Sequence, residues 1–213
     1  MANRDPDLRE EMALCAQGYR LIAGLDEVGR GSWAGPVVAG AVILPLGSPS
    51  LRERLQGVRD SKVLTPRQRD RLYDVIQASA LAIGVGIVPA TMIDALGIVQ
   101  ATKLAMEEAI RDLGLIPHFL VIDGLELPSV PIPQKKIFKG DSLCLSIAAA
   151  SIVAKVSRDR MMIALEGHYP GYGFARHKGY GTSQHRQALE RLGICPLHRL
   201  SFAPMKHMIE SPP

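Results

Sequence analysis

The sequence lacks long hydrophobic runs and has few cysteines, and both features limit the classes of protein to which it can belong. No window offers the roughly 18 to 20 consecutive apolar residues that a membrane-spanning helix needs, and the polar start MANRDPDLREE has no apolar signal-peptide region. The three cysteines, Cys15, Cys144 and Cys195, are odd in number, far apart and without metal-ligand spacing. This pattern disfavours a disulfide framework and a zinc site. We therefore expect a soluble globular protein of the reducing cytoplasm.

Positive charge is present in modest excess. The 213 residues are 47% hydrophobic, which is enough for a buried core in one or two domains. A net charge of +4 and a pI near 9.1 weakly favour a polyanionic partner, because excess Lys and Arg attract phosphate. The charges are scattered along the chain, so folding must assemble any basic surface.

Hydrophobic patterns and turn residues predict strands alternating with helices. We expect strands at 21–25, 36–44 and 81–88, in HFLVIDG up to Asp123, and in KKIFKGD up to Asp141. We expect helices at 66–80, where TPRQ has capping-box spacing, and at 98–113, 142–168 and 183–192. This order predicts a mixed α/β sheet with helices packed on it. No internal repeat appears, and no linker precedes Gly167.

Acidic residues stand at the ends of three predicted strands. They are Asp26, Glu27, Asp123 and Asp141. In an open α/β sheet such side chains converge on one crevice, although here they lie far apart in sequence. Clustered carboxylates repel unless cations lie among them, and oxygen ligands suit Mg²⁺ or Mn²⁺. Two ions about 4 Å apart can stabilise both oxygens of a phosphoryl transfer, so the pattern favours phosphodiester cleavage.

Each acid taken alone also has an ordinary structural interpretation. Aspartates often form turns, and Asp141 would be a good N-cap for the long helix that follows. Asp26 and Glu27 are harder to explain in this way, because buried charges cost several kcal/mol unless they are paired. Neighbouring strand residues point to opposite faces, so we expect a bend near Val28 and Gly29. On an undistorted strand, Glu27 would act through its backbone carbonyl, through water, or not at all.

The segment Gly29, Arg30 and Gly31 offers backbone amides and one guanidinium to a closely approaching ligand. This arrangement suits phosphate or sugar contacts. The segment lacks both the P-loop pattern and dinucleotide glycine spacing, which disfavours a nucleoside-triphosphate site.

Several long segments together resemble one family. The segments LDEVGRGSWAGPVVAGAV, DSKVLTPRQR, VIDG, KGDSLCLSIAAASIVAKVSRD, GYGFARHKGYGT and HRLSFAP are similar to the type 2 ribonucleases H, specifically bacterial ribonuclease HII. The resemblance covers about residues 19–205 in the family's order. It implies a ribonuclease H-like fold, a mixed five-stranded sheet flanked by helices, with a C-terminal helical extension. We expect an N-terminal extension at 1–18, a catalytic domain at 19–167 and the C-terminal extension at 168–213.

The resemblance also implies the chemistry. The family's catalytic and metal-binding acids correspond to Asp26, Glu27, Asp123 and Asp141, which would hold two Mn²⁺ or Mg²⁺ ions. Asp26 would contact both ions, and Asp141 would bind the second only with substrate present. The implied activity is endonucleolytic cleavage of the RNA strand in RNA/DNA hybrids, including single ribonucleotides embedded in duplex DNA. The products would carry 5′-phosphate and 3′-hydroxyl ends, as ribonucleotide excision repair requires.

Substrate recognition follows from the same resemblance. Gly29, Arg30 and Gly31 would grip the 2′-hydroxyl, which alone marks a ribonucleotide, and Tyr180 would pack on the sugar of the following nucleotide. We expect phosphate contacts from three further residues, Ser61, Lys62 and Lys178. For Tyr172, packing beneath the loop is an even alternative to function. Arg158 and Asp159 could equally form a helix-surface ion pair, and we leave them out of the catalytic set.

Three other hypotheses compete with a two-metal nuclease. A binding module that has lost its chemistry would not need all four acids. A small-molecule phosphatase would not explain the glycine-flanked arginine or Tyr180. A type 3 ribonuclease H carries an extra N-terminal domain, for which the 18 residues before Tyr19 are too few. We expect a monomer acting on hybrid or ribonucleotide-containing duplex, with no membrane partner, and its tail lacks a clear clamp-binding pattern.

Overall fold

A computed structural model describes residues 5–210 of the protein. Its strands are β1 (Ile22–Val28), β2 (Val37–Ile43), β3 (Ala82–Val88), β4 (Phe119–Asp123) and β5 (Gln134–Ile137). Its helices are α1 (Arg9–Ala16), α2 (Leu51–Arg54), α3 (Pro66–Ser79), α4 (Ala90–Leu96), α5 (Ile98–Asp112), α6 (Leu145–Glu166), α7 (Phe174–His177), α8 (Ser183–Leu192) and α9 (Met205–Glu210). Two 3₁₀ turns, η1 (Ser61–Val63) and η2 (Gly140–Ser142), complete the fold.

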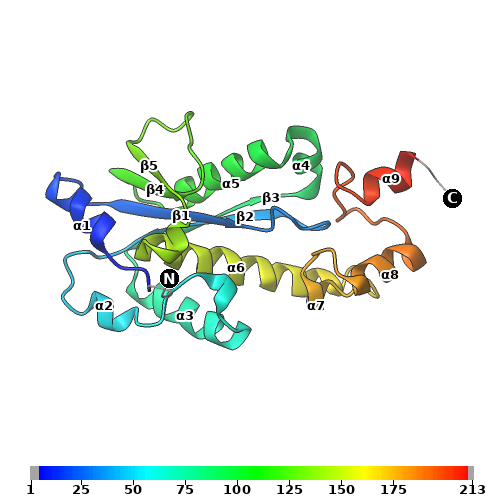
Figure 1. The fold of residues 1–213 in the computed structure, drawn as a ribbon, viewed down its shortest axis with the longest axis horizontal. Helices are drawn as coiled ribbons and strands as arrows, with labels where there is room; N and C mark the ends of the chain where they lie inside the picture. Colours follow the sequence, from blue (N-terminus) through cyan, green and yellow to red (C-terminus); the bar gives the residue numbers. More distant parts are fainter. Residues whose placement is uncertain (1–4, 211–213) are drawn as a thin grey trace.

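The strands form one mixed sheet, in the order β3-β2-β1-β4-β5. β1 pairs antiparallel with β2, which pairs antiparallel with β3, whereas β4 lies parallel to both β1 and β5. α4 and α5 cover one face of the sheet, and α6 with α2 and α3 covers the other (Figure 1). The predicted mixed five-stranded α/β fold is therefore confirmed.

Side-chain alternation along β1 assigns its two faces. Ala23 and Leu25 pack in the core on the α5 side, and Ile22 packs with Ile147 of α6 on the other side. Glycines let the helices approach closely: a Cβ at Gly24 would lie 2.3 Å from the backbone of α6, and one at Gly86 would lie 1.9 Å from the backbone of α5. Both helices therefore rest directly on the sheet.

The sequence misplaced one site-bearing element. KKIFKGD was expected to be a strand up to Asp141, but β5 ends at Ile137 and Asp141 lies in η2. The strand cannot continue because Lys139 adopts a left-handed conformation, with φ of 56°, which turns the chain. α6 begins only at Leu145 with Cys144 as its N-cap, so Asp141 is not that cap.

The two ends of the chain pack differently. The described residues before Tyr19 contact the sheet domain, because the buried Glu11 accepts hydrogen bonds from the amide of Ser146 (2.9 Å) and from the thiol of Cys144 (3.1 Å). α7, α8 and α9 gather at the far end of α6, beyond the sheet (Figure 1). No helix among residues 5–210 is long and apolar enough to cross a bilayer. The expected division at 18 and 167 stays a prediction.

Candidate active site

Three of the four candidate acids gather on the face of the sheet that α6 covers. Side chains alternate between the two faces along each strand, so Asp26 lies on the same face of β1 as Ile22. At the end of the neighbouring parallel strand β4, Asp123 lies on the same face as Val121. Asp123 accepts a hydrogen bond of 2.7 Å from the amide of Gly140, which fixes η2 and hence Asp141 beside it. Acids from three separate segments thus converge at one end of the sheet.

The Glu27 side chain points outward from the opposite face of the sheet. β1 stays in regular register with β2 through Val28, and the turn at Gly29, with φ of 91°, follows both acids. The bend therefore comes too late to bring the two side chains to one face. The last residue of β1 that pairs with β4 is Leu25, so the strand end that carries Asp26 and Glu27 is open beside β4. The Glu27 side chain accepts a hydrogen bond of 3.2 Å from Arg30.

Burial and mutual repulsion make these acids costly to ionise. Burial raises the pKa of Asp26 well above its usual range, and the charges of Glu27, Asp123 and Asp141 raise it further. Burial also raises the pKa of Glu27, although Arg30 opposes this shift. The pKa of Asp123 is raised by burial and by the charge of Asp141, against the hydrogen bond from Gly140. The site therefore has excess negative charge that a cation would relieve.

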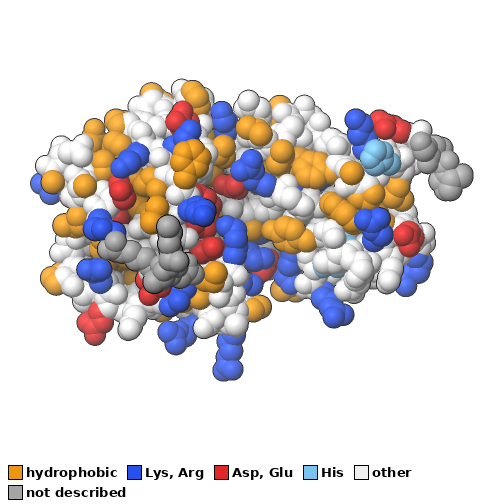
Figure 2. Space-filling view, in the orientation of Figure 1, with side chains coloured by type: hydrophobic (Ala, Val, Ile, Leu, Met, Phe, Trp, Pro, Cys, Tyr) orange, Lys and Arg blue, Asp and Glu red, His pale blue; other side chains and the backbone are white. Residues whose placement is uncertain are grey.

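Lys62 supplies one cation to this site. Its ammonium lies 3.1 Å from Asp141 and 3.8 Å from Asp60, which also caps η1. Partial burial alone would lower the pKa of Lys62, but the hydrogen bond and the charge of Asp141 raise it above its ordinary value. Ser61, expected to contact phosphate, is buried, and its hydroxyl accepts a 2.8 Å hydrogen bond from Ser151 of α6. On the side of the molecule shown in Figure 2, acidic side chains lie near the middle of the surface, with Lys and Arg side chains beside them.

The donor chemistry fits a hard divalent cation, because every candidate ligand is a carboxylate oxygen and the acids repel one another. As the side chains lie, no three His, Cys, Asp or Glu residues within the described range form a group that could hold a metal ion. Arg30 and Lys62 account for part of this arrangement, since each binds one acid. Ion binding would compete with these two contacts.

Two buried arginines fix the Gly29–Gly31 loop from below. Arg158 donates to the carbonyls of Pro36 (2.8 Å), Ala34 (3.1 Å) and Lys178 (2.8 Å), and a Cβ at Gly29 would lie 2.3 Å from its Nε. Arg199 donates to the carbonyl of Arg30 at 2.9 Å and to that of Gly35 at 3.0 Å. The hydrogen bonds of these two guanidinium groups thereby connect the Gly29–Gly31 loop to the C-terminal segment.

The surface ion pair suggested for Arg158 is wrong. Its side chain is fully buried, and Asp159 instead binds Lys155 at 2.6 Å and Arg69 at 3.6 Å. Burial lowers the pKa of Arg158 and lowers that of Arg199 to about 9. Sequence reasoning missed both residues as supports of the loop. The available signal was Arg158 itself, a charge within the apolar repeat of a long helix.

Tyr180 and Tyr172 have different surroundings. The Tyr180 ring lies 5.4 Å from the guanidinium of Arg158 and 5.8 Å from the ammonium of Lys155, at the edge of a cationic pocket. Tyr172 is buried, stacks on Phe174, and donates a 3.0 Å hydrogen bond to the carbonyl of Gly193. The structure thus gives Tyr172 a packing role. Lys178 adopts a left-handed conformation, with φ of 53°, and its ammonium donates to the carbonyl of Ala175.

Comparisons with known proteins bear on this site. A family model described as ribonuclease HII matches residues 23–205. The chain is 55% identical over 206 residues to a ribonuclease HII of Dehalococcoides mccartyi, with 96% of each chain covered. It is 54% identical to one of Roseiflexus castenholzii, with 98% of this chain and 93% of the relative covered.

Solved structures show the same architecture. The ribonuclease H2 of Pyrococcus horikoshii matches with a TM-score of 0.74 and 26% identity, over 89% of this chain and 97% of that one. A ribonuclease HIII in complex with Mn²⁺, Bst-RNase HIII, matches with a TM-score of 0.72 and 21% identity, over 89% of this chain and 69% of that one. At that identity the second match shows the fold alone.

Proposed function

This chain belongs to the ribonuclease HII family, and we propose that it cuts beside single ribonucleotides embedded in duplex DNA by two-metal catalysis. As a ribonuclease H it hydrolyses the RNA strand of RNA/DNA hybrids. The observation that carries the finer proposal is the convergence of Asp26, Asp123 and Asp141. Burial, together with the charges of its acidic neighbours, raises the pKa of Asp26. A site with that excess of negative charge is suited to bind cations rather than to stabilise the fold.

Asp26 and Asp123 would hold two Mg²⁺ or Mn²⁺ ions, Asp141 would join them when substrate is bound, and Glu27 would complete the set. When bound, such ions stabilise charge on the attacking and leaving oxygens of a phosphodiester and favour ionised water. Lys62 binds Asp141 at 3.1 Å, which suits a role in exchanging that carboxylate for a substrate phosphate. Glu27 leaves the opposite face, so we assign its contribution to its backbone carbonyl or to a bridging water.

Recognition of the ribonucleotide would depend on the Gly29–Gly31 loop. A 2′-hydroxyl both donates and accepts a hydrogen bond, and a rigid backbone can select for it. Arg199 fixes the carbonyl of Arg30, and Arg158 fills the space under Gly29, which supports such rigidity. Tyr180, over the guanidinium of Arg158, would pack on the sugar of the following nucleotide. Lys178 and Lys62 would contact phosphates. Ser61 is buried and its hydroxyl is bonded to Ser151, which does not support the phosphate contact expected of it.

The remaining expectations belong to the same proposal. The products would be 5′-phosphate and 3′-hydroxyl ends, as the first cut of ribonucleotide excision repair in the cytoplasm, made by a monomer. One structural neighbour is described as a complex of PCNA with the ribonuclease HII of Archaeoglobus fulgidus, at 25% identity and a TM-score of 0.70. A sliding clamp is therefore a partner to test for this chain, although its tail has no clear clamp-binding pattern.

A comparison of three duplexes tests the proposal. The enzyme is assayed with Mg²⁺ or Mn²⁺ on an all-DNA duplex, a duplex containing one ribonucleotide, and a long hybrid. We expect a cut at the single ribonucleotide, none in all-DNA, and no cut in EDTA. Cleavage that continues in EDTA, or at an unchanged rate in Asp26→Asn, contradicts the metal mechanism. Turnover of a chromogenic phosphomonoester with no cut in either ribonucleotide substrate would favour a phosphatase.

A further inference from the structure

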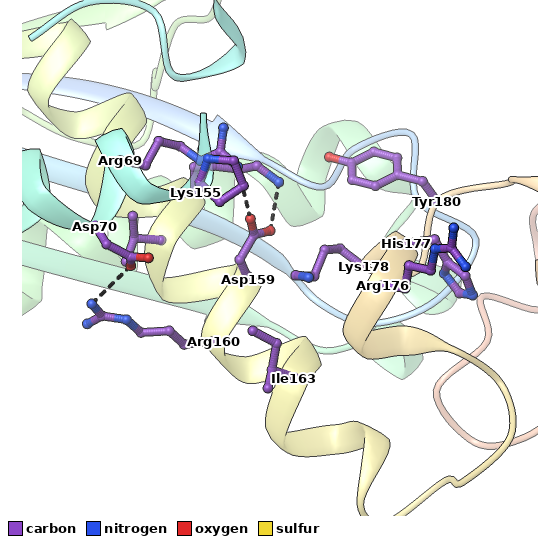
Figure 3. Close-up of a pocket in the computed structure, with 12 residues that line it drawn as sticks. Arg69, Asp70, Lys155, Asp159, Arg160, Ile163, Arg176, His177, Lys178 and Tyr180 are labelled. Atoms are coloured by element: carbon purple, nitrogen blue, oxygen red, sulfur yellow. Dashed lines mark hydrogen bonds and ion pairs between the residues drawn. The ribbon is translucent and has the colours of Figure 1, made fainter. Parts of the chain in front are cut away.

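A second cationic feature lies next to Tyr180, in a pocket of about 610 Å³. One wall is the first turn of α3 with Pro66 and Arg69, a second is the C-terminal half of α6, and a third is the segment 176–180. Figure 3 shows Arg69, Lys155 and Asp159 close together, with Tyr180 and Lys178 on the side of the pocket towards α7. We refer to it as the α3–α6 pocket.

Cationic side chains outnumber acidic ones in its walls. The cations are Arg69, Lys155, Arg160, Arg176 and Lys178, and the acids are Asp70 and Asp159. Both acids are already paired: Asp159 with Lys155 and Arg69, and Asp70 with Arg160 at 3.2 Å. Arg176 and Lys178 therefore have no carboxylate partner among residues 5–210. The pocket can accept an anion without breaking an existing ion pair.

The surroundings of Lys178 indicate the sign of the missing partner. Partial burial lowers its pKa, and the charges of Lys155, Arg69 and Arg158 lower it further, whereas Asp159 opposes them. The Lys178 ammonium is thus in positive surroundings, hydrogen-bonded only to the carbonyl of Ala175. A phosphate oxygen would relieve this repulsion and would take several charge-assisted hydrogen bonds at once.

The pocket lies at a defined distance from the cut. α6 begins at Leu145, just after Asp141, and reaches Lys155 ten residues later, a rise of about 15 Å. Duplex DNA advances about 3.4 Å per nucleotide of one strand, so this length corresponds to about four nucleotides. Lys62 lies beside Asp141 on the neighbouring η1–α3 segment, and Arg69 of the pocket donates to the carbonyl of Ser61, the residue before Lys62, at 3.1 Å. The η1–α3 segment therefore connects the acids to the pocket.

We infer that the α3–α6 pocket binds a backbone phosphate of the DNA 3′ to the ribonucleotide, up to about four nucleotides from the cut, through Lys155, Arg176 and Lys178. The inference rests on the proposed function, since the side is set by the nucleotide assigned to Tyr180. The pocket would hold the strand beside that tyrosine, which lies at the edge of the pocket. This second attachment point makes a long 3′ DNA arm part of the binding site.

The test is duplex binding in EDTA, measured by fluorescence anisotropy across a range of salt concentrations. Arg176→Gln and Lys178→Gln are compared with wild type on a duplex with twelve nucleotides 3′ to the ribonucleotide and on one with a single such nucleotide. On the long duplex each variant should weaken binding about three- to tenfold and reduce the slope of log K against log salt by about one. On the short duplex the variants should match wild type.

Arg71→Gln is the matched control. It removes the same charge from an exposed position on α3, and Arg71 lines a different hollow, so it should retain the wild-type slope. The inference is overturned if Arg176→Gln and Lys178→Gln behave like Arg71→Gln on the long duplex, or if they weaken both duplexes equally. Failure of the proposed function would look different: wild type would bind but leave a single ribonucleotide uncut with Mg²⁺ or Mn²⁺, whatever the salt slopes.

Discussion

The protein buries titratable groups in two regions and treats them in opposite ways. At the end of β1 and β4, the pKa values of Asp26 and Asp123 are raised by burial and by neighbouring acids. Between α7 and α8, the pKa values of His177, His185 and His198 are lowered by burial. We call these the acid cluster and the histidine cluster.

The histidine cluster is complete in itself. His177 Nε2 lies 2.8 Å from the carbonyl of Tyr172, His185 Nδ1 lies 3.0 Å from that of Tyr180, and the Nε2 atoms of His185 and His198 lie 3.1 Å apart. Neutral imidazoles can alternate as donor and acceptor in such a chain. The acid cluster has only acceptors and like charges. The difference separates a region built for stability from one whose charges need a ligand.

The largest expected effect comes from removing a charge in the acid cluster. Asp26→Asn should lower the rate of metal-dependent nicking by about 10³-fold or more, because it would remove a carboxylate proposed to hold the divalent ions. The amide oxygen can still accept from the amide of Glu27, and a buried charge disappears, so the free energy of unfolding in EDTA should be unchanged or raised by about 1 kcal/mol. Urea denaturation measures this value. A strongly destabilised variant would mean that the acid cluster supports the fold.

Removing a member of the histidine cluster should have the opposite profile. His185→Leu removes the hydrogen bond to the carbonyl of Tyr180 and the one shared with His198 Nε2, which should cost about 2 to 3 kcal/mol of unfolding free energy. The value of kcat should stay within about threefold, since no acid moves, while KM rises with the displaced Tyr180. His168→Gln, at an exposed position, is the control for urea denaturation. If kcat falls with stability unchanged, the comparison of the two regions is wrong.

Divalent cations should stabilise only through the acid cluster. At ten times its dissociation constant, Mn²⁺ should raise the free energy of unfolding of the wild type by about 1.4 kcal/mol. The same gain is expected in His185→Leu and none in Asp26→Asn. Thermal unfolding with and without the ion gives the three values. An equal gain in Asp26→Asn would place the ion elsewhere.

The smallest effect is the dependence of stability on pH in metal-free protein. The acid cluster has raised folded pKa values, so it retains protons on folding and gains relative stability as pH falls through those values. The histidine cluster loses stability as pH falls from about 6.5 towards the folded pKa of His185, about 4. Between these limits, Asp26→Asn should therefore steepen the acid loss of stability and His185→Leu should flatten it, by about 1 kcal/mol or less. Urea midpoints at several pH values test the two slopes, and parallel profiles in all three proteins would refute them.

Local patterns made most of the fold predictable. α3 has the capping box read from Thr65, Pro66 and Gln68, and α8 begins and ends where the pattern placed it. The convergence of the acids was expected, because side chains at the ends of neighbouring strands lie close together. The sequence left open whether a bend brings Glu27 to the same face as Asp26. The register of β1 and β2 shows that the turn comes after both residues.

Buried contacts between residues far apart in the chain could not be predicted from the sequence. Arg158 and Arg199 bind carbonyls of segments more than 100 residues away, and no local pattern reports such partners. The end of β5 depended on a left-handed Lys139, a conformation that Lys rarely adopts. The α3–α6 pocket unites residues of three elements that are separate in sequence. Tertiary packing, rather than propensity, decides each of these features.

The tight seating of α6 on the sheet restricts how this enzyme can change in length. A side chain at Gly24 or Gly40 would push the helix away from the sheet, because neither position has room for a Cβ. One residue inserted between Ser151 and Lys155 would rotate everything beyond it by about 100°. Arg158 would then swing out from beneath Gly29, and Lys155 would leave the pocket. Insertions and deletions should therefore accumulate in surface loops such as 45–50, while α6 keeps a fixed number of residues between the acids and Tyr180.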